Sequence, residues 1–231
     1  MTGTAVKTPR GVLTAFAASP DQGRGLARDM AVRWALEEAG RPYDVRTVAL
    51  QDLRNRAHLQ RQPFGQIPTW QDGDTRLFES GAIVLHLAEA NEGLLPTDPA
   101  ARARALSWMF AAAATVEPAV THLEVARRAY GTAPWREAAL TPLVEAVARR
   151  LEALDSVLKG QEWLDGRFTA GDLLMIQVLR RLEGGDLLDA WPALTAWVER
   201  GKARPAFQRA FEAQRESWRR TSTRDPGAGR P

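Results

Sequence analysis

The sequence of 231 residues contains no cysteine. Disulfide bonds and thiolate metal sites are therefore excluded, and any reaction that uses a sulfur nucleophile must receive that sulfur from a ligand. Histidine is also scarce, since His58, His86 and His122 are the only three and none stands at a metal-ligand spacing from another. We therefore expect no metal site.

Long apolar runs are absent as well, because no run approaches the ~20 residues that a membrane-spanning helix needs. The opening residues MTGTAVKTPRG lack the apolar core of a secretion signal, so we expect a cytoplasmic protein without a membrane partner. The 31 basic and 28 acidic side chains are interspersed rather than blocked, which argues against a nucleic-acid surface despite the formal charge of +3. The 45% hydrophobic content is enough for a buried core.

The first third of the chain alternates strand and helix patterns. Residues 11–16 and 43–50 are predicted strands, and the helical spacing of apolar residues between them makes a β-α-β unit with parallel strands. A weaker helix and two short antiparallel strands follow, the strands being joined by a tight turn at Asp72-Gly73. A further helix begins at Ser80 or Gly81, which completes the order β-α-β-α-β-β-α.

Beyond residue 98 only helices are predicted. Asp98 and Pro99 have the residue types of an N-cap and a first helical position, and Pro118 should kink or end that helix. Thr169 and Asp172 have the spacing of a capping box at the start of an apolar, central helix. We therefore predict an α/β domain over residues 11–92, an all-α domain over residues 98–218 and a disordered tail over residues 219–231.

A possible ligand site lies in the stretch QPFGQIPTWQDGDTRLFESGAIVLHL. Pro68 fits a strand start, particularly if the Ile67–Pro68 bond is cis, and the unpaired backbone of Ile67 could then bind an extended peptide. Ser80 stands at a helix N-terminus, which suits a carboxylate, and Glu79 beside it could pair with an ammonium group. Alternatively, Ser80 merely caps the helix, Glu79 complements its dipole and nothing binds.

These motifs resemble those of the cytosolic glutathione transferases over roughly residues 11–215. The similar segments, in chain order, are VRWALEEAGRPYDV, GQIP, LFESGAI, LLPTDPAARARAL and FTAGD. The resemblance implies an α/β thioredoxin-like N-terminal domain followed by an all-α helical bundle, a homodimer, and a detoxifying transfer of glutathione to small apolar electrophiles. It also implies that the edge formed by Gln66, Ile67 and Pro68 holds the cysteinyl part of glutathione, and that Glu79 and Ser80 hold its γ-glutamyl end.

The sequence offers several candidates for the group that activates the thiol. Members of the family commonly use a tyrosine, serine or cysteine near the end of the first strand, but Tyr43 and Tyr130 lie elsewhere. Ser19 is the only hydroxyl in the segment AASPDQGRGLARD and is the first candidate, although it could instead form a local turn. Arg28, an amide of the first helix or Gln22 could stabilise the thiolate instead.

The second substrate leaves several functions open. By resemblance it would lie between the two domains, where Phe16, Trp108 and Ala112 could form apolar walls, although a cluster such as Trp108–Phe110 is more often ordinary core. A glutathione-dependent isomerase or dehalogenase on the same fold is one alternative. A non-catalytic, glutathione-transferase-like interaction module is another.

Overall fold

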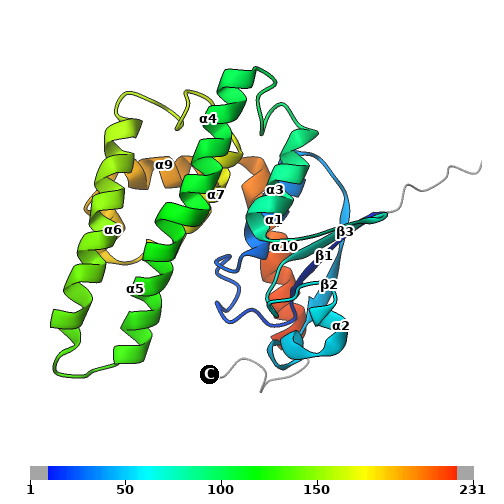
Figure 1. The fold of residues 1–231 in the computed structure, drawn as a ribbon, viewed down its shortest axis with the longest axis horizontal. Helices are drawn as coiled ribbons and strands as arrows, with labels where there is room; N and C mark the ends of the chain where they lie inside the picture. Colours follow the sequence, from blue (N-terminus) through cyan, green and yellow to red (C-terminus); the bar gives the residue numbers. More distant parts are fainter. Residues whose placement is uncertain (1–9, 223–231) are drawn as a thin grey trace, which may run out of the picture.

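The first part of the chain folds into a four-stranded sheet with helices packed on it (Figure 1). The computed structural model describes residues 10–222. The elements of this part are β1 (Gly11–Phe16), α1 (Asp29–Glu38), β2 (Tyr43–Val48), the 3-10 turn η1 (Leu50–Arg54), α2 (Arg56–Leu59), β3 (Thr69–Asp72), β4 (Thr75–Phe78) and α3 (Ser80–Glu89). This order agrees with the predicted β-α-β-α-β-β-α order, with η1 added.

The sheet has the strand order β2-β1-β3-β4. β1 pairs with β2 in parallel, as the β-α-β pattern predicts, and β3 pairs antiparallel to both β1 and β4. The β3–β4 turn lies one residue later than predicted, because Asp72 still pairs with Thr75 and the turn residues are Gly73 and Asp74. Gly73 has φ +54°, which glycine adopts without steric cost.

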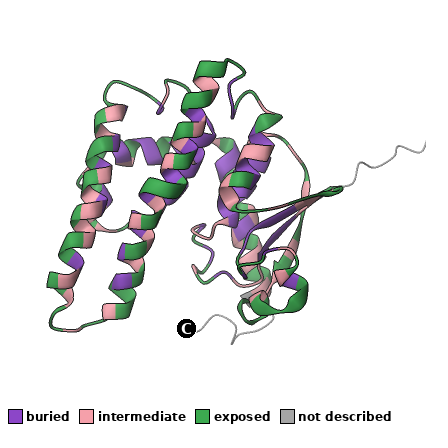
Figure 2. Ribbon diagram, viewed as in Figure 1, coloured by how far each residue is buried: buried purple, intermediate pink, exposed green. Residues whose placement is uncertain are grey.

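Helices α1 and α3 pack against each other, and both contact α7 of the second part. Met30, Trp34 and Leu36 of α1 are fully buried, as are Ile83 and Val84 of α3. Figure 2 shows the buried positions of the molecule concentrated along the sheet and along the helices between the two parts. The two parts therefore share a continuous apolar core.

The second part is helical. Its elements are α4 (Pro99–Phe110), a π-helical segment η2 (Ala111–Val116), α5 (Glu117–Tyr130), α6 (Arg136–Leu158), α7 (Ala170–Leu179), the 3-10 turn η3 (Arg180–Leu182), α8 (Asp186–Asp189), α9 (Pro192–Lys202) and α10 (Pro205–Ser222). Asp98 caps α4 by accepting a hydrogen bond from the Ala101 amide. Pro118 cannot donate a backbone hydrogen bond and lies in the first turn of α5, directly after η2, so the α-helix that begins at Pro99 ends before Pro118.

Helix α7 is the buried centre of the helical part. All its residues are buried, and its predicted capping box is present, with the Asp172 carboxylate bonded to the backbone of Thr169. Asp172 also accepts a hydrogen bond from the Leu164 amide at 2.9 Å. Burial outweighs these bonds and raises the pKa of Asp172 to about 6.

Helix α10 returns to the α/β part and packs along α1. Gln214 of α10 donates a hydrogen bond to Asp29, which is buried with Arg33 in an ion pair. The helix continues to Ser222 and so includes residues 219–222 of the predicted tail; the remainder of that tail, 223–231, lies outside the described residues. Among the described helices, none has the length and apolar character needed to cross a membrane.

Candidate active site

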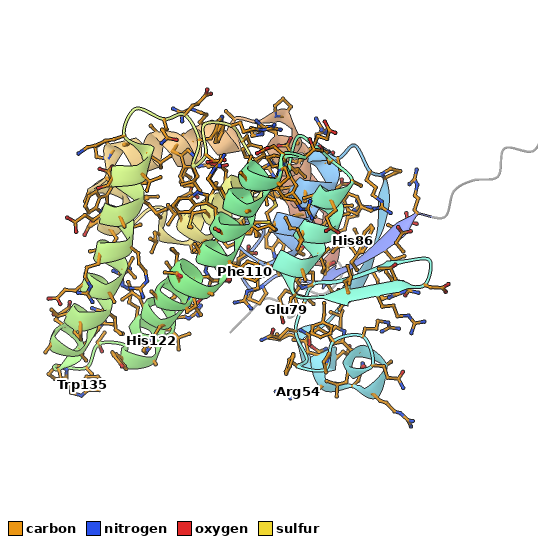
Figure 3. The ribbon with its side chains drawn as sticks, turned by 45° about the horizontal axis from the view of Figure 1, so that its top comes forward. Arg54, Glu79, His86, Phe110, His122 and Trp135 are labelled. Atoms are coloured by element: carbon orange, nitrogen blue, oxygen red, sulfur yellow. The ribbon has the colours of Figure 1, made fainter. Side chains whose placement is uncertain are left out.

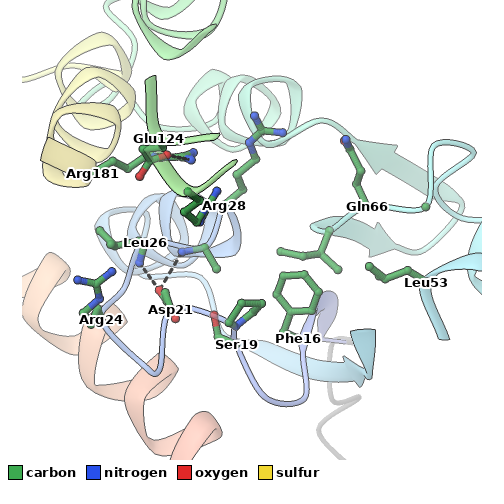
Figure 4. A pocket seen from close by; sticks show the side chains of 15 residues that line it. Phe16, Ser19, Asp21, Arg24, Leu26, Arg28, Leu53, Gln66, Glu124 and Arg181 are labelled. Atoms are coloured by element: carbon green, nitrogen blue, oxygen red, sulfur yellow. Dashed lines mark hydrogen bonds and ion pairs between the residues drawn. The ribbon is translucent and has the colours of Figure 1, made fainter. Parts of the chain in front are cut away.

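The two parts of the molecule meet at a cleft of about 350 Å³ (Figure 4). One wall comes from the loop after β1 and from the segment that leads into β3. The opposite wall comes from α5 and η3 of the helical part. The lining residues that matter below are Phe16, Ser19, Arg24, Arg28, Gln66, Ile67, Glu124, Arg128 and Arg181.

The segment before β3 presents backbone atoms to this cleft. The Ile67–Pro68 peptide bond is cis, in agreement with the prediction. Ile67 lies outside the β1–β3 ladder, and neither its amide nor its carbonyl has a hydrogen-bond partner among residues 10–222. The preceding carbonyl, that of Gln66, accepts a hydrogen bond at 2.7 Å from His58, which is buried. His58 therefore anchors the segment from behind, whereas the Ile67 backbone stays free to pair with a ligand.

The start of α3 lies beside the main cleft. Ser80 lines a smaller pocket of about 40 Å³, which shares Leu26, Arg28 and Arg181 with the cleft. Glu79 precedes it at the helix start, is exposed, and has φ +68° and ψ 117° (Figure 3). This backbone conformation is strained for a residue with a side chain. No side chain caps α3, so its first amides are not satisfied by the chain in the usual way.

Ser19 is buried at the base of the cleft, with 8% of its surface exposed (Figure 4). Its local turn forms through the backbone, because the carbonyl of Ser19 accepts the hydrogen bond from the Gln22 amide. The hydroxyl Oγ is buried and has no hydrogen-bond partner among the described residues. A buried, unpartnered hydroxyl is costly, and Ser19 is therefore a candidate to bond a ligand atom.

Arg28 also lines the cleft, but its charge is already paired. Its guanidinium donates to Glu117 of α5 at 2.8 Å. Arg181 of η3 lies 3.6 Å from the same Glu117 and also pairs with Glu124. These two arginines and two glutamates form a mutually neutralised ion-pair cluster on the helical wall.

The loop that carries Ser19 and Arg28 is held from two directions. Asp21 accepts hydrogen bonds from the amides of Gly23, Leu26 and Ala27, two of which are drawn in Figure 4. From the helical part, Arg180 donates to the carbonyls of Arg24 and Gly25 at 2.9 and 2.7 Å. Gln177 donates to the Gly25 carbonyl as well.

Arg180 has 4% of its surface exposed and packs over the Phe207 ring at 4.8 Å. Burial lowers the pKa of Arg180, and its nearest carboxylate oxygen, on Glu183, is 3.6 Å away. Such a buried cation holds the loop in one position through directed hydrogen bonds.

The structure brings most of the predicted site residues together. Ser19, Arg28, Gln66 and Ile67 line one cleft, and Ser80 lines the pocket beside it. Pro68 is buried behind the edge, and Glu79 lies outside both linings.

Three of the other predicted side chains have different positions. Gln22 is exposed outside the cleft lining, and Trp108 packs beside Gly171 rather than facing either pocket. Ala112 lines only the smaller pocket. In the part of the chain that the structure describes, no group of three or more acidic or histidine side chains could hold a metal ion.

The residues that fix the loop were not among those predicted from the sequence. Asp21 follows Ser19-Pro20 in a turn-forming context, which is a recognisable signal for a side chain that bonds nearby amides. Arg180, Glu117 and Arg181 give no comparable signal, because they reach the site from parts of the sequence far from the loop.

The fold has a thioredoxin-like N-terminal part followed by a helical part, and residues of both parts line the cleft. A family model for the glutathione S-transferase N-terminal domain matches residues 22–89, and one for the C-terminal domain matches residues 119–205. The chain is 31% identical to a glutathione S-transferase of Hyoscyamus muticus, covering 79% of this chain and 92% of that one. It is 29% identical to glutathione S-transferase 1 of Zea mays, covering 79% and 90%.

Solved structures give the same result. A glutathione transferase family member from Pseudomonas fluorescens is 28% identical, with a TM-score of 0.77 and coverage of 90% of this chain and 95% of that one. A glutathione transferase from Burkholderia graminis is 26% identical, with a TM-score of 0.78 and coverage of 91% and 90%. The chain therefore belongs to the glutathione S-transferase family and is a glutathione transferase.

Proposed function

We propose that the cleft binds reduced glutathione in an extended conformation along the free backbone of Ile67. The γ-glutamyl end would lie at the start of α3, with its carboxylate at the Ser80 amide and hydroxyl and its ammonium group near Glu79. The thiol would then point toward Ser19. Binding of two glutathione molecules by each of the relatives from P. fluorescens and B. graminis supports this assignment.

The observation that carries the proposal is the buried Ser19 hydroxyl without a partner. A free thiol has a pKa near ~8.5 and is mostly protonated at neutral pH, so an enzyme must favour the thiolate. A hydrogen bond from Ser19 Oγ–H to the sulfur would do this. Arg28 would contribute less, because Glu117 already balances its charge.

The thiolate would attack the electrophilic carbon of a second substrate in the same cleft. The new carbon–sulfur bond forms as the bond to the leaving group breaks, and the leaving group departs with the electron pair. The thiol proton passes to solvent before the attack. Phe16 offers an apolar wall for the electrophile, as expected from the sequence.

Ultraviolet titration of the glutathione thiolate in the complex tests this proposal. We expect the bound thiol to ionise at lower pH than free glutathione in the wild type. Ser19→Ala should shift the ionisation upward and lower kcat by on the order of 100-fold, as for loss of one oriented donor at a reacting atom. Arg28→Gln should have a smaller effect. Unchanged ionisation in Ser19→Ala would contradict the role of the hydroxyl.

A second candidate function is glutathione-dependent reduction of a disulfide, in view of the two glutathione molecules bound per subunit of the B. graminis relative. One glutathione thiolate would attack the disulfide and release a thiolate, and a second would resolve the mixed disulfide to glutathione disulfide. No protein cysteine is needed for this sequence of steps. The test is the rate at which glutathione disulfide forms when a small disulfide is the substrate. A measurable rate with the wild type and a much lower rate with Ser19→Ala would support this second function.

We also propose a cytoplasmic homodimer that detoxifies electrophiles. The cytosol maintains the reduced glutathione pool that the reaction consumes. Phe64 is 62% exposed beside the exposed Phe78, and Phe110 of α4 is exposed as well (Figure 3). Exposed aromatic side chains on both parts suit an interface with a second copy. Light scattering should give a dimer mass at micromolar protein, and Phe64→Ser should shift it toward the monomer.

A further inference from the structure

The charged side chains of the cleft are unevenly paired. Arg28, Arg181, Glu117 and Glu124 neutralise one another in the ion-pair cluster described above. Arg24 and Arg128 also line the cleft and are exposed, yet neither has an ion-pair partner among residues 10–222.

Asp21 is the remaining carboxylate in the lining, and it is already bonded to three backbone amides. With two unpaired arginines against this one carboxylate, the cleft has an excess of positive charge. Arg24 comes from the loop after β1 and Arg128 from α5, so the excess lies at the junction with the helical wall.

The position of Arg24 and Arg128 is distinct from the proposed glutathione-binding site. The Ile67 edge and the start of α3 belong to the α/β part, whereas Arg128 projects from the helical part on the opposite side of the cleft. We propose that Arg24 and Arg128 form a carboxylate subsite for the second substrate. This inference rests on the proposed function and changes the predicted substrate from an apolar electrophile to one that also carries an anionic group.

Two sources could supply that carboxylate, an anionic electrophile or a second glutathione molecule. Both would bring a carboxylate into a cleft lined by two arginines without an ion-pair partner, and a guanidinium group can bind a carboxylate through two parallel hydrogen bonds. Because both arginines are exposed, each pair contributes modestly, and salt should weaken the effect.

The first test compares para-(chloromethyl)benzoate with its methyl ester as electrophiles. The glutathione thiolate forms a carbon–sulfur bond with the benzylic carbon of either compound, and chloride leaves with its electron pair. We expect kcat/KM of the wild type to favour the carboxylate by about tenfold at low salt, since two exposed ion pairs are gained. Arg24→Gln and Arg128→Gln should each reduce this preference. Arg127→Gln removes a neighbouring, unpaired arginine outside the cleft lining and should retain it.

The second test measures how many glutathione molecules bind per chain by calorimetry. Two in the wild type and one in Arg128→Gln would identify a second glutathione as the occupant. A carboxylate preference with one glutathione per chain would identify an anionic electrophile.

Faster or equal turnover of the ester by the wild type, together with one glutathione per chain, would overturn the carboxylate subsite and leave the proposed function intact. Failure of the wild type to bind any glutathione would overturn both.

Discussion

Helices α3 and α7 both begin at a short polar motif, but the chain satisfies only one of these helix starts by itself. At α7, Thr169 and Asp172 complete a reciprocal capping box in a fully buried setting. At α3, no side chain caps the helix, and Glu79 is exposed in a strained conformation beside the half-buried Ser80. A helix start that is closed internally serves the fold, whereas one left open and held under strain is available to a ligand.

The largest expected difference between the two helix starts is in the pH dependence of stability. The pKa of Asp172 is raised from 3.8 to about 6 because its carboxylate is buried. Between these values the folded chain keeps a proton that the unfolded chain has lost, so the free energy of unfolding falls as the pH rises. The total fall from this group should be roughly 3 kcal/mol between pH ~4 and ~7.

Urea denaturation at several pH values measures this fall. Asp172→Asn should lack this contribution to the slope. Equal slopes in the wild type and Asp172→Asn would show that Asp172 does not titrate as stated.

The next largest expected difference is in the free energy of unfolding when one hydroxyl is removed from each helix start. Thr169→Ala removes the side-chain acceptor of the Gly171 amide and should lower the free energy of unfolding by about 1 kcal/mol. Ser80→Ala removes a hydroxyl that makes no cap and should change it by less than ~0.5 kcal/mol. Denaturant titration of Thr169→Ala and Ser80→Ala measures both changes in the free energy of unfolding. An equal decrease in the two variants would mean that the Ser80 hydroxyl stabilises the fold.

The smallest expected change in the free energy of unfolding comes from relieving the backbone strain at Glu79. Glu79→Gly places at φ +68° the residue that adopts positive φ without steric cost, and should raise the free energy of unfolding by about 0.5 kcal/mol. Glu79→Gln keeps the Cβ atom and therefore the strain, so its stability should match the wild type. If the glycine variant were the less stable of the two, the α3 start would not be strained.

Features that depend on contacts between residues close in the chain could be predicted from the sequence. The spacing of Thr169 and Asp172, the Asp98-Pro99 pair and the periodic apolar positions each involve residues a few places apart, so their pattern is visible in the sequence. Of the residues that the family resemblance implies for the site, Ile67 lines the cleft and Ser80 lines the pocket beside it, whereas Glu79 lies outside both linings. The one-residue error in the β3–β4 turn arose because Asp72-Gly73 is a common turn pair, although strand pairing places Asp72 in β3.

The loop after β1 could not be predicted in this way. Its shape depends on Arg180 and Gln177, which approach it from the centre of the helical part. The partner of Arg28 is Glu117, on a helix whose sequence gives no sign of that contact. Contacts between such distant residues leave no periodicity, which is why Ser19 and Arg28 had to remain alternatives until their surroundings were known.

Calorimetric titration with reduced glutathione tests most directly whether the uncapped start of α3 binds this ligand. We expect the wild type and Thr169→Ala to bind with similar affinity, and Ser80→Ala to bind at least about tenfold more weakly, the equivalent of one lost charge-assisted hydrogen bond. Equal affinity in the wild type and Ser80→Ala, or no binding by the wild type at millimolar glutathione, would contradict the account.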